Sequence, residues 1–327
     1  MAGVRWSVAV PAEVTTEYAG TKLGAYYLDP ETQWRTKEVG RGRLRDLFGI
    51  GGGRPSAEVP AYVGAAALGA ELVYPEDHMP QVVGHALRRP EDVFSLAIPE
   101  DYLDTPPMRP FVALQRWVQA RAGDEQRVPL GSGLEGPITT AKLLRGQDFF
   151  LDLYENPQAA HHLLDVVTES IIRFSRQVRR FNGAPTDRGT GIADDFAGLI
   201  SPAMWPEFVM PYYRRIYHAF GEGPRGHHSE LLRPGHLPFL LELGVTSFDP
   251  GQDQYLTIED IRGAAPGLPF TWNLKTVAEM AQGTPESIRR AYEDAVARGA
   301  RAIMVELCRN TPPENIHAFI AVAREYA

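Results

Sequence analysis

Three side chains in the last third of the chain could together bind a metal ion. His228 and Glu230 are separated by one residue, and Cys308 is the single cysteine of the sequence. Imidazole, carboxylate and thiolate are good ligands for zinc, and three protein ligands leave the fourth position that a catalytic zinc needs. The spacing alone is a weak signal, because an isolated His-x-Glu is usually a solvated loop and a lone cysteine is usually a small buried hydrophobe.

Further polar side chains lie in loops that follow predicted strands. They are Thr139, Asp194, Asp195, His227, Asp249, Asn273, Lys275 and Glu306. One aspartate of the pair Asp194 and Asp195 could position a substrate or relay a proton, although either could instead cap the next segment. Substrate binding is predicted for Thr139, Asn273, Lys275, Asp249 and His227. Asn273 and Lys275 could instead belong to a loop that faces solvent. His227 could instead lie beside the metal ligand His228 and support it.

Strands and helices alternate over the same part of the chain. We expect strands at residues 245–248, 268–272 and 302–307 and one that ends near His227, with helices at 234–243, 257–264, 284–298 and 313–326. This alternation indicates parallel strands with crossover helices. It favours a (β/α)8 barrel, a TIM barrel, over a doubly wound sheet, because no Gly-x-Gly-x-x-Gly follows a strand. In such a barrel, functional side chains meet where the strands end.

The earlier part of the chain is less regular. A long helix is predicted from Asn156 to Asn182, with Pro157 in its first turn and Gly183 after its end. A second helix should begin at Ser201 and bend or restart at Pro206 and Pro211. Short strands are expected at residues 128–131 and 189–193. Residues 1–60 are predicted to be an irregular N-terminal extension, and residues 61–327 the barrel. The glycine-rich residues 49–55 are interpreted as a plain loop, since they lack the Gly-Lys-Ser/Thr ending of a P-loop.

Charge and cysteine content exclude several classes of protein. The 327 residues include 33 Lys and Arg against 41 Asp and Glu, a net charge of −8. This excess of acidic residues gives no indication that the protein binds nucleic acid or an anionic membrane. A single cysteine excludes an internal disulfide framework. The N-terminal apolar run is too short for a signal peptide, and no apolar stretch is long enough to span a membrane. We therefore expect a cytoplasmic protein.

Several short blocks carry a resemblance to a known family. They are Gly136-Pro137-Ile138-Thr139-Thr140-Ala141, Ala193-Asp194-Asp195-Phe196 with Ser201-Pro202, Leu241-Glu242-Leu243-Gly244-Val245, and Thr311-Pro312-Pro313-Glu314-Asn315-Ile316. In their order and spacing, they resemble the uroporphyrinogen decarboxylase superfamily, and within it the methylcobalamin-dependent methyltransferase branch. The match runs over roughly residues 60–327. The resemblance implies a (β/α)8 barrel, in agreement with the strand and helix pattern.

The resemblance also implies an activity and a ligand set. Family methyltransferases bind zinc through a His-x-Cys pair and a distant Cys, which fall on His228, Glu230 and Cys308, so this chain departs from the pattern at Glu230. A carboxylate in place of a thiolate makes the site harder and favours oxygen as the fourth ligand. The implied reaction is zinc-dependent methyl transfer between a corrinoid (methylcobalamin or cob(I)alamin), carried by a partner protein, and a small thiol or methyl ether. The family further suggests a homodimer.

Two alternatives remain open at this point. One is a cofactor-free decarboxylase of porphyrin biosynthesis, whose substrate is rich in carboxylates and needs several Arg or Lys to hold it. The family's arginine motif is missing here, although Arg41, Arg43, Arg45 and Arg54 occupy the corresponding region in another context. The other is a non-catalytic barrel that binds a tetrapyrrole, which would tolerate His228→Ala and Cys308→Ala.

Overall fold

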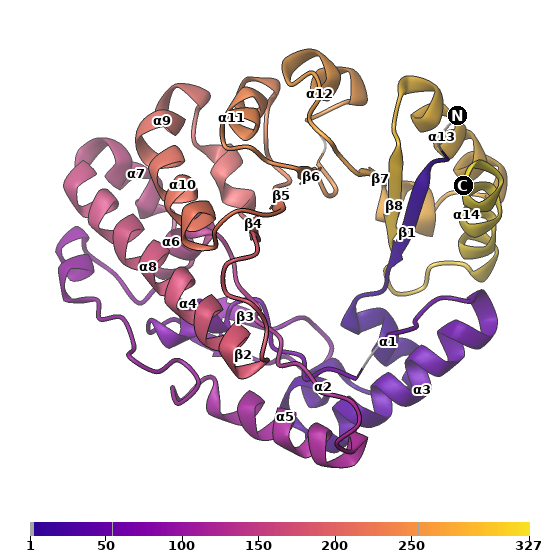
Figure 1. The fold of residues 1–327 in the computed structure, drawn as a ribbon, viewed down its shortest axis with the longest axis horizontal. Coiled ribbons are helices and arrows are strands. Elements are labelled where there is room, and N and C mark those ends of the chain that lie inside the picture. The colour runs from indigo at the N-terminus through magenta and orange to yellow at the C-terminus, as the bar shows by residue number, and fades with distance from the viewer. Residues whose placement is uncertain (1–2, 54, 254) are drawn as a thin grey trace.

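The elements of the protein form a ring when it is viewed along its shortest axis (Figure 1). The structure is a computed structural model that describes residues 3–53, 55–253 and 255–327. In Figure 1 the strands β4–β8 and β1 line the inside of the ring, and the helices that connect them lie outside. No helix within these ranges is long and apolar enough to cross a membrane. The protein therefore has an α/β architecture.

The inner strands run parallel to one another. The described strands are β1 (Arg5–Ala9), β2 (Glu71–Val73), β3 (Gln81–Val83), β4 (Thr190–Ala193), β5 (Arg225–His228), β6 (Ser247–Asp249), β7 (Trp272–Leu274) and β8 (Ala302–Glu306). One sheet has the order β4-β5-β6 and another the order β1-β8-β7. A parallel bridge between Phe248 and Phe270 joins the β6 side to the segment that leads into β7. The carboxyl ends of these six strands therefore point the same way.

Helices cover the outside of the strands. They are α1 (Ala12–Ala19), α2 (Leu23–Leu28), α3 (Pro30–Phe48), α4 (Val63–Ala67), α5 (Arg109–Ala122), α6 (Pro137–Arg145), α7 (Asp148–Glu155), α8 (Pro157–Phe181), α9 (Trp205–Phe208), α10 (Met210–Ala219), α11 (Leu237–Glu242), α12 (Ile258–Ala264), α13 (Pro285–Arg298) and α14 (Pro313–Tyr326). Short 3₁₀ segments lie at Pro90–Ser95, Asp195–Leu199, Pro202–Met204 and Pro234–His236, and a π-helix lies at Thr276–Ala281.

Most elements predicted for the second half of the chain are confirmed. Helix α8 follows Asn156, and α12, α13 and α14 fall within a residue of their predicted bounds. The helix after Ser201 restarts as predicted, since a 3₁₀ turn, α9 and α10 follow one another at its prolines. The predicted strand at 268–272 is wrong in position, because β7 begins at Trp272. Pro269 has no amide hydrogen for a strand ladder, so regular pairing starts after it.

The first 60 residues contain more structure than the irregular extension that was expected. Strand β1 pairs with β8, and α1, α2 and α3 follow it. Helix α3 escaped notice because its inner face is polar and small rather than apolar, with Gln33, Thr36 and Gly40 buried beside Leu44. The boundary at residue 60 itself stays a prediction.

The segment predicted as a strand at residues 128–131 forms only one parallel bridge. Leu130 pairs with Ala57, and the amide of Gly131 donates to the carbonyl of Ala57 at 2.8 Å. The loop at 49–55 follows the end of α3, as expected for a plain connection, apart from residue 54, which lies outside the described residues.

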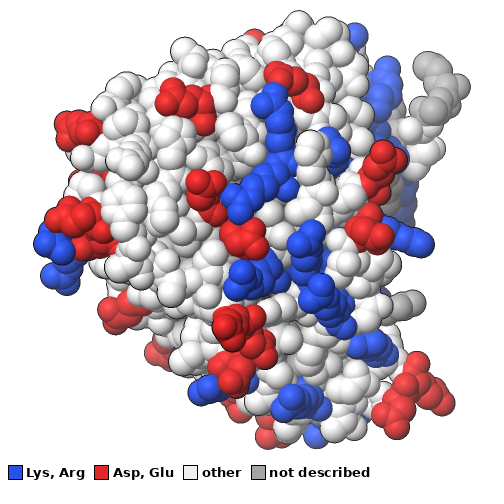
Figure 2. All heavy atoms as spheres, turned by 60° about the vertical axis from the view of Figure 1, so that its left-hand side comes forward, with Lys and Arg blue, Asp and Glu red and all other residues white. Residues whose placement is uncertain are grey.

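Apolar side chains gather in three clusters that fix the helices on the strands. One unites β7, β8, α13 and α14, a second unites α6–α10 with β4–β6, and a third joins α2 and α5 to the end of α8. On the face presented in Figure 2, basic and acidic side chains are interspersed and neither covers the surface alone. That face offers no extended basic patch to a nucleic acid.

Candidate active site at the carboxyl ends of the strands

Backbone hydrogen bonds continue past the strands and draw their carboxyl ends together. The amide of Asp194, after β4, donates to the carbonyl of His228 at 3.0 Å. The amide of Ser229, after β5, donates to the carbonyl of Asp249 at 3.2 Å. As predicted for parallel strands, the side chains at these ends share one edge.

Asp194 is a buried anchor between β4 and the start of α6. Its Oδ1 accepts hydrogen bonds from the amide and the hydroxyl of Thr139, both at 2.7 Å. Its Oδ2 accepts from the amide of Ile138 and the hydroxyl of Tyr213, both at 3.0 Å. Burial raises the pKa of Asp194 to about 6, although these donors oppose the shift. Because both oxygens are engaged and the side chain is fully buried, Asp194 and Thr139 hold the turn rather than face a substrate.

The next aspartate, Asp195, faces the candidate site instead. Its Oδ1 accepts from the amide of Glu230 at 3.0 Å and lies 3.5 Å from Nε2 of His228. Burial raises the pKa of Asp195, while the charge of His228 opposes that rise. The structure thus separates the two neighbouring aspartates into an anchor and a group that touches His228.

His228 lies between two carboxylates. Its Nδ1 donates to Oδ2 of Asp249 at 3.1 Å, while its Nε2 faces Asp195. Burial lowers the pKa of His228, but the bond to Asp249 and the negative charges of Asp249, Asp195 and Glu230 outweigh it and raise the pKa to about 9. At neutral pH the ring is therefore an imidazolium with one nitrogen fixed and the other directed at Asp195.

Asp249 orients the imidazole because it is itself fixed. Its Oδ1 accepts hydrogen bonds from the side-chain amide of Asn273 and from the backbone amide of Gly251. Burial raises the pKa of Asp249, and the contacts with His228, Gly251 and Asn273 more than reverse that effect, so the net shift is downward. Asn273, predicted to bind substrate, is buried and supports Asp249 instead.

Glu230 packs beside His228. Its Oε1 accepts from the amide of Gln252 at 2.9 Å. A Cβ added to Gly251 would lie 2.5 Å from Oε1 of Glu230 and 2.8 Å from Cε1 of His228, so both side chains close on this glycine. Gly251 also has a φ of +56°, a left-handed conformation that favours glycine.

Two more carboxylates contribute to the site. Glu135 precedes Gly136 at the start of α6, and burial, together with the charges of Asp195 and Asp194, raises its pKa to about 8. Burial and the charges of Glu13 and Glu230 likewise raise the pKa of Glu306. Glu306 was noticed in the sequence as a residue at a strand end, whereas Glu135 was missed. Its position directly before the Gly136-Pro137 helix start was the available signal.

Of the predicted substrate-binding residues His227 and Lys275, His227 lies elsewhere than expected. His227 is buried between the rings of Tyr213 and Phe248, and neither of its nitrogens has a hydrogen-bond partner among the described residues. It points away from His228 because successive strand residues alternate faces. Lys275 donates its Nζ to the carbonyl of Asp253 and lies 5.5 Å from the centre of the Trp272 ring. Asp249 and Lys275 therefore remain at the strand ends, and His227 belongs to the core.

The three predicted metal ligands do not form a metal-binding cluster. Within the described ranges, no group of three or more His, Cys, Asp and Glu side chains is arranged to hold a metal ion. Cys308 is half-buried, and its Sγ lies 3.6 Å from the hydroxyl of Thr311. His228 and Glu230 come together at Gly251, but their neighbours are Asp195 and Asp249 rather than Cys308.

Comparisons with known proteins give relatives of two kinds. A uroporphyrinogen decarboxylase from Xanthomonas oryzae pv. oryzae is 30% identical over 140 residues, which cover 42% of this chain and 38% of that enzyme. A methylated-thiol–coenzyme M methyltransferase from Methanosarcina mazei is 24% identical over 294 residues, which cover 86% of this chain and 74% of that protein. A methylcobamide:CoM methyltransferase from the same organism is 23% identical over 254 residues, or 76% of this chain and 72% of that protein. The match thus spans about two fifths of the decarboxylase and nearly three quarters of each methyltransferase.

A solved structure and a family model also match most of the chain. A methyltransferase from Methanosarcina mazei superposes with a TM-score of 0.76 at 18% identity, covering 100% of this chain and 95% of that one. That likeness supports the α/β fold. The model of the uroporphyrinogen decarboxylase (URO-D) family matches residues 60–326. The chain is therefore a member of the uroporphyrinogen decarboxylase family.

Proposed function

We propose that this protein is a methyltransferase that exchanges a methyl group between a corrinoid and a small molecule, and that it does not decarboxylate uroporphyrinogen. The names of the two long-matching relatives, a methylated-thiol–coenzyme M methyltransferase and a methylcobamide:CoM methyltransferase, support this choice. The corrinoid is a substrate here, as the second of these names suggests, and we propose that a separate protein carries it.

The observation that carries the proposal is the ring of carboxylates around His228. Asp249 and Asp195 flank the imidazole, and Glu230 lies beside it at Gly251. Glu135 and Glu306 add two further carboxyl groups to the same edge, and burial and the neighbouring carboxylates raise the pKa of both. A porphyrinogen rich in carboxylates would meet like charges at this edge, and such juxtapositions cost several kcal/mol. A small neutral methyl donor or acceptor meets no such repulsion.

The chemistry that this arrangement supplies is proton transfer to the heteroatom that loses the methyl group. In the demethylation direction, an electron pair of cob(I)alamin forms the new bond to the methyl carbon, and the bond from that carbon to oxygen breaks. The oxygen keeps its electron pair and takes the proton from Nε2 of His228. Asp249 keeps the ring oriented, and Asp195 faces the nitrogen that gives up the proton. The step balances, because a proton replaces the methyl group on the oxygen and the electron pair of cobalt(I) forms the bond of methyl-cobalt(III).

Zinc at His228, Glu230 and Cys308 stays a prediction of the sequence. A histidine whose Nδ1 is held by a carboxylate is the usual form of a zinc ligand, and His228 meets that requirement. The side chain of Cys308 does not join it, and the described residues offer no group of three ligands. We derive no catalytic step through a metal.

We further propose that the ring is a complete (β/α)8 barrel and that the protein forms a homodimer. Six parallel strands and the isolated parallel bridge between Ala57 and Leu130 support the barrel. The homodimer rests on the family resemblance alone.

The test is an anaerobic assay of the purified protein with cob(I)alamin and a methyl phenyl ether, and, in the reverse direction, methylcobalamin with a small neutral thiol. We expect a change in the corrinoid absorbance spectrum with the wild-type protein, and a rate lower by about 10²–10⁴-fold with His228→Gln. His218→Gln is the matched control, because His218 is an exposed histidine on α10. Decarboxylation of uroporphyrinogen without any methyl transfer would reverse the assignment.

A further inference from the structure

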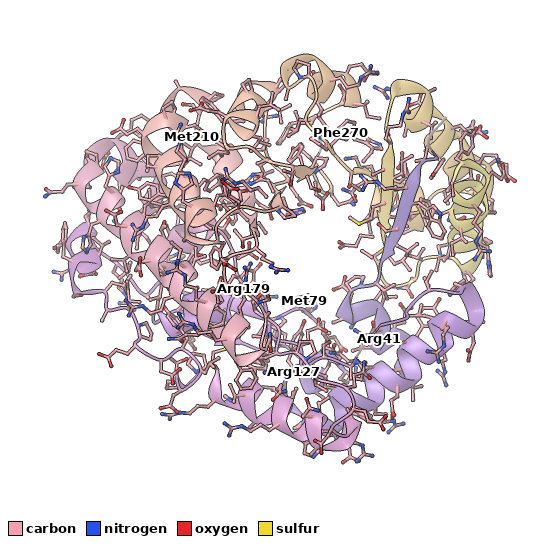
Figure 3. The ribbon with its side chains drawn as sticks, in the orientation of Figure 1. Arg41, Met79, Arg127, Arg179, Met210 and Phe270 are labelled. Atoms are coloured by element: carbon pink, nitrogen blue, oxygen red, sulfur yellow. The ribbon has the colours of Figure 1, made fainter. Side chains whose placement is uncertain are left out.

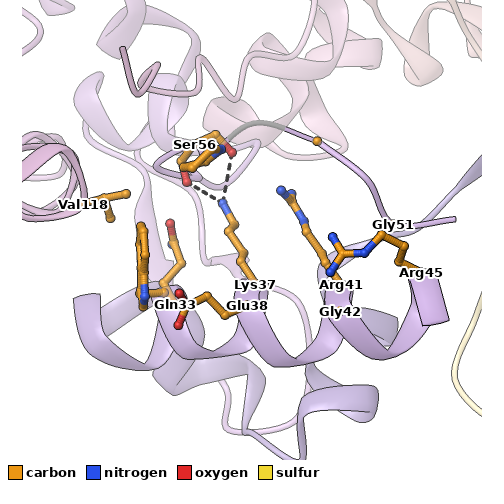
Figure 4. A pocket seen from close by; sticks show the side chains of 12 residues that line it. Gln33, Lys37, Glu38, Arg41, Gly42, Arg45, Gly51, Ser56 and Val118 are labelled. Carbon is orange, nitrogen blue, oxygen red and sulfur yellow. Dashed lines mark hydrogen bonds between the residues drawn. The ribbon is translucent and has the colours of Figure 1, made fainter. Parts of the chain in front are cut away.

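A cavity of about 390 Å³ lies away from the strand ends, along one side of α3. The glycine-rich loop after α3 and Val118 of α5 form its other walls (Figure 4). Its lining consists of Gln33, Trp34, Lys37, Glu38, Arg41, Gly42, Arg45, Gly51, Gly53, Pro55, Ser56 and Val118. In Figure 3, Arg41 lies on the α3 side of the ring, across from strands β4, β5 and β6. The cavity is thus separate from the candidate active site.

Three cationic side chains face this cavity at successive turns of α3. Lys37, Arg41 and Arg45 are four residues apart, so they share one face of the helix. Figure 4 shows them side by side below the loop. Against them, Glu38 is the single acidic side chain among the described lining residues. In a chain with a net charge of −8, this is a local excess of positive charge.

Lys37 serves the protein itself. Its Nζ donates to the carbonyl and the hydroxyl of Ser56, at 2.6 and 3.1 Å, and lies 3.4 Å from a carboxylate oxygen of Glu58. These contacts tie the loop to α3 and neutralise the charge of Lys37. Lys37 is thus engaged by the protein, and Arg45, two turns further along α3, is the cationic lining residue whose charge is available to a ligand.

Hydrogen-bond donors that have no acceptor in the described part of the protein lie at this end of the cavity. The guanidinium of Arg45 makes no hydrogen bond or ion pair with any other described residue, and Nη1 of Arg41 lies 3.6 Å from the position a Cβ would take on Gly53. Within the described part of the loop, the amides of Gly51, Gly52 and Gly53 donate to no protein acceptor. Guanidinium groups and clustered backbone amides are the donors that phosphate oxygens take.

The other end of the cavity is aromatic. Trp34 precedes Arg41 by two helical turns, roughly 10 Å along the axis. Val118 of α5 lies in the wall at this end, and the guanidinium of Arg121 lies 5.9 Å from the Trp34 ring centre. A cavity of about 390 Å³ is far larger than one phosphate and falls in the range of sites for organic ligands. Its ligand should carry a flat ring at one end and an anion at the other.

We propose that this cavity binds a nucleoside phosphate, with the base beside Trp34 and the phosphate groups between Arg41, Arg45 and the amides of Gly51–Gly53. The loop is not a P-loop, because it follows the end of a helix instead of preceding one. Gly51 permits close approach to α3, because a Cβ at this position would lie 3.0 Å from Cβ of Leu44. The proposal goes beyond methyl transfer and does not depend on it.

Titration calorimetry of the full chain with ADP, adenosine and pyrophosphate tests the proposal. We expect saturable binding of ADP to one site, and weaker binding of adenosine and of pyrophosphate. Arg45→Gln should weaken ADP binding about tenfold or more, because it removes a charged donor to phosphate. Trp34→Leu should weaken ADP binding by about five- to a hundredfold and leave pyrophosphate binding unchanged.

The matched control is Arg35→Gln, an exposed arginine on α3 that does not line the cavity. It changes the net charge by the same amount as Arg45→Gln and should leave ADP binding unchanged. The proposal is overturned if ADP gives no saturable heat, if Arg45→Gln binds ADP as the wild type does, or if adenosine or pyrophosphate alone binds as tightly as ADP. A thermal melt of each variant shows that the fold is retained.

Discussion

At the residue scale, His228 owes its charge to Asp249. Asp249→Asn removes both the negative charge and the acceptor that faces Nδ1 of His228. The bond and charge of Asp249 are the largest of the contributions that raise the pKa of His228 to about 9, and the charges of Asp195 and Glu230 add to them, so we expect that pKa to fall towards its ordinary value of 6.5 in the variant. The measurement is an NMR titration of the histidine ring protons.

The assignment of the titrating ring needs a control. His228→Gln removes the His228 resonance, so the signal that is lost in this variant identifies the ring whose pKa is compared in the wild type and in Asp249→Asn. A His228 titration that does not move would show that Asp249 does not hold the imidazolium. Methyl transfer by the variant should fall with the pKa, because the proton donor is then largely lost at neutral pH.

The contribution of the Thr139–Asp194 hydrogen bond to the free energy of unfolding should depend on pH. The pKa of Asp194 is raised to about 6, so the carboxylate is charged above that pH and needs its donors most there. Thr139→Val removes the hydroxyl donor to Oδ1 at nearly constant volume. We expect a loss of about 2 kcal/mol of unfolding free energy at pH 7 and a smaller loss at pH 5, where Asp194 is largely protonated.

Urea unfolding at the two pH values measures this difference. Thr140→Val is the control, because the hydroxyl of Thr140 donates at 3.3 Å to the neutral carbonyl of Glu135. It should cost less, about 0.5–1 kcal/mol, and equally at both pH values. Equal losses at pH 5 and pH 7 for Thr139→Val would mean that the Thr139 hydroxyl does not stabilise the charged form of Asp194.

At the scale of elements, helix α3 packs closely against α1 at Gly40. A Cβ added to Gly40 would lie 2.3 Å from the carbonyl oxygen of Thr15, which is backbone and cannot turn aside. Gly40→Ala should therefore destabilise the protein by about 1–3 kcal/mol, as overpacking does in other cores. Thermal unfolding followed by circular dichroism measures the effect.

Gly42 on the same helix is the matched control. The nearest atom to a Cβ at this position is Nη2 of Arg45 at 3.9 Å, an ordinary contact with a mobile group. Gly42→Ala should raise stability by about 0.5–1 kcal/mol, because alanine is the better helix former. If both substitutions act alike, close packing of α3 on α1 is not what requires Gly40.

At the scale of the whole molecule, the first strand of the described chain pairs with the last one, and the two ends of the chain lie together. Strand β1 pairs with β8 over its full length, from Arg5 opposite Ala302 to Ala9 opposite Glu306. The amide of Val4 also donates to the carbonyl of Tyr326 at 2.8 Å. The ring thus depends on a contact between residues about as far apart in the sequence as this chain allows.

Removal of residues 1–10 tests that dependence. The deletion leaves the edge of β8 without a partner and uncovers apolar side chains of the cluster that holds α13 and α14. We expect a melting temperature at least roughly 10 °C lower, or an insoluble protein, because several apolar contacts are lost together. Ser7→Ala, an exposed substitution within β1, should leave the melting temperature unchanged. An unchanged melt of the deletion would show that β1 is dispensable for the fold.

The sequence by itself determined the elements whose signals are local. Helix α8 has an apolar face at helical spacing, a proline in its first turn and a glycine after its end, and these are properties of neighbouring residues. The alternation of strands and helices after residue 225 likewise placed His228, Glu230, Asp249 and Lys275 at one edge, because parallel strands must end together. Short blocks of residues also predicted the family to which the chain belongs.

Only the tertiary structure showed which of those residues are buried in the core and which face the candidate site. Asp194 and Asp195 are adjacent and chemically identical, yet one is an anchor with both oxygens engaged and the other faces His228. His227 and His228 divide in the same way between core and site. Helix α3 was hidden because it buries polar and small side chains against α1. The physical reason is common to all three cases: burial and hydrogen bonding are set by partners distant in sequence, and no local spacing records them.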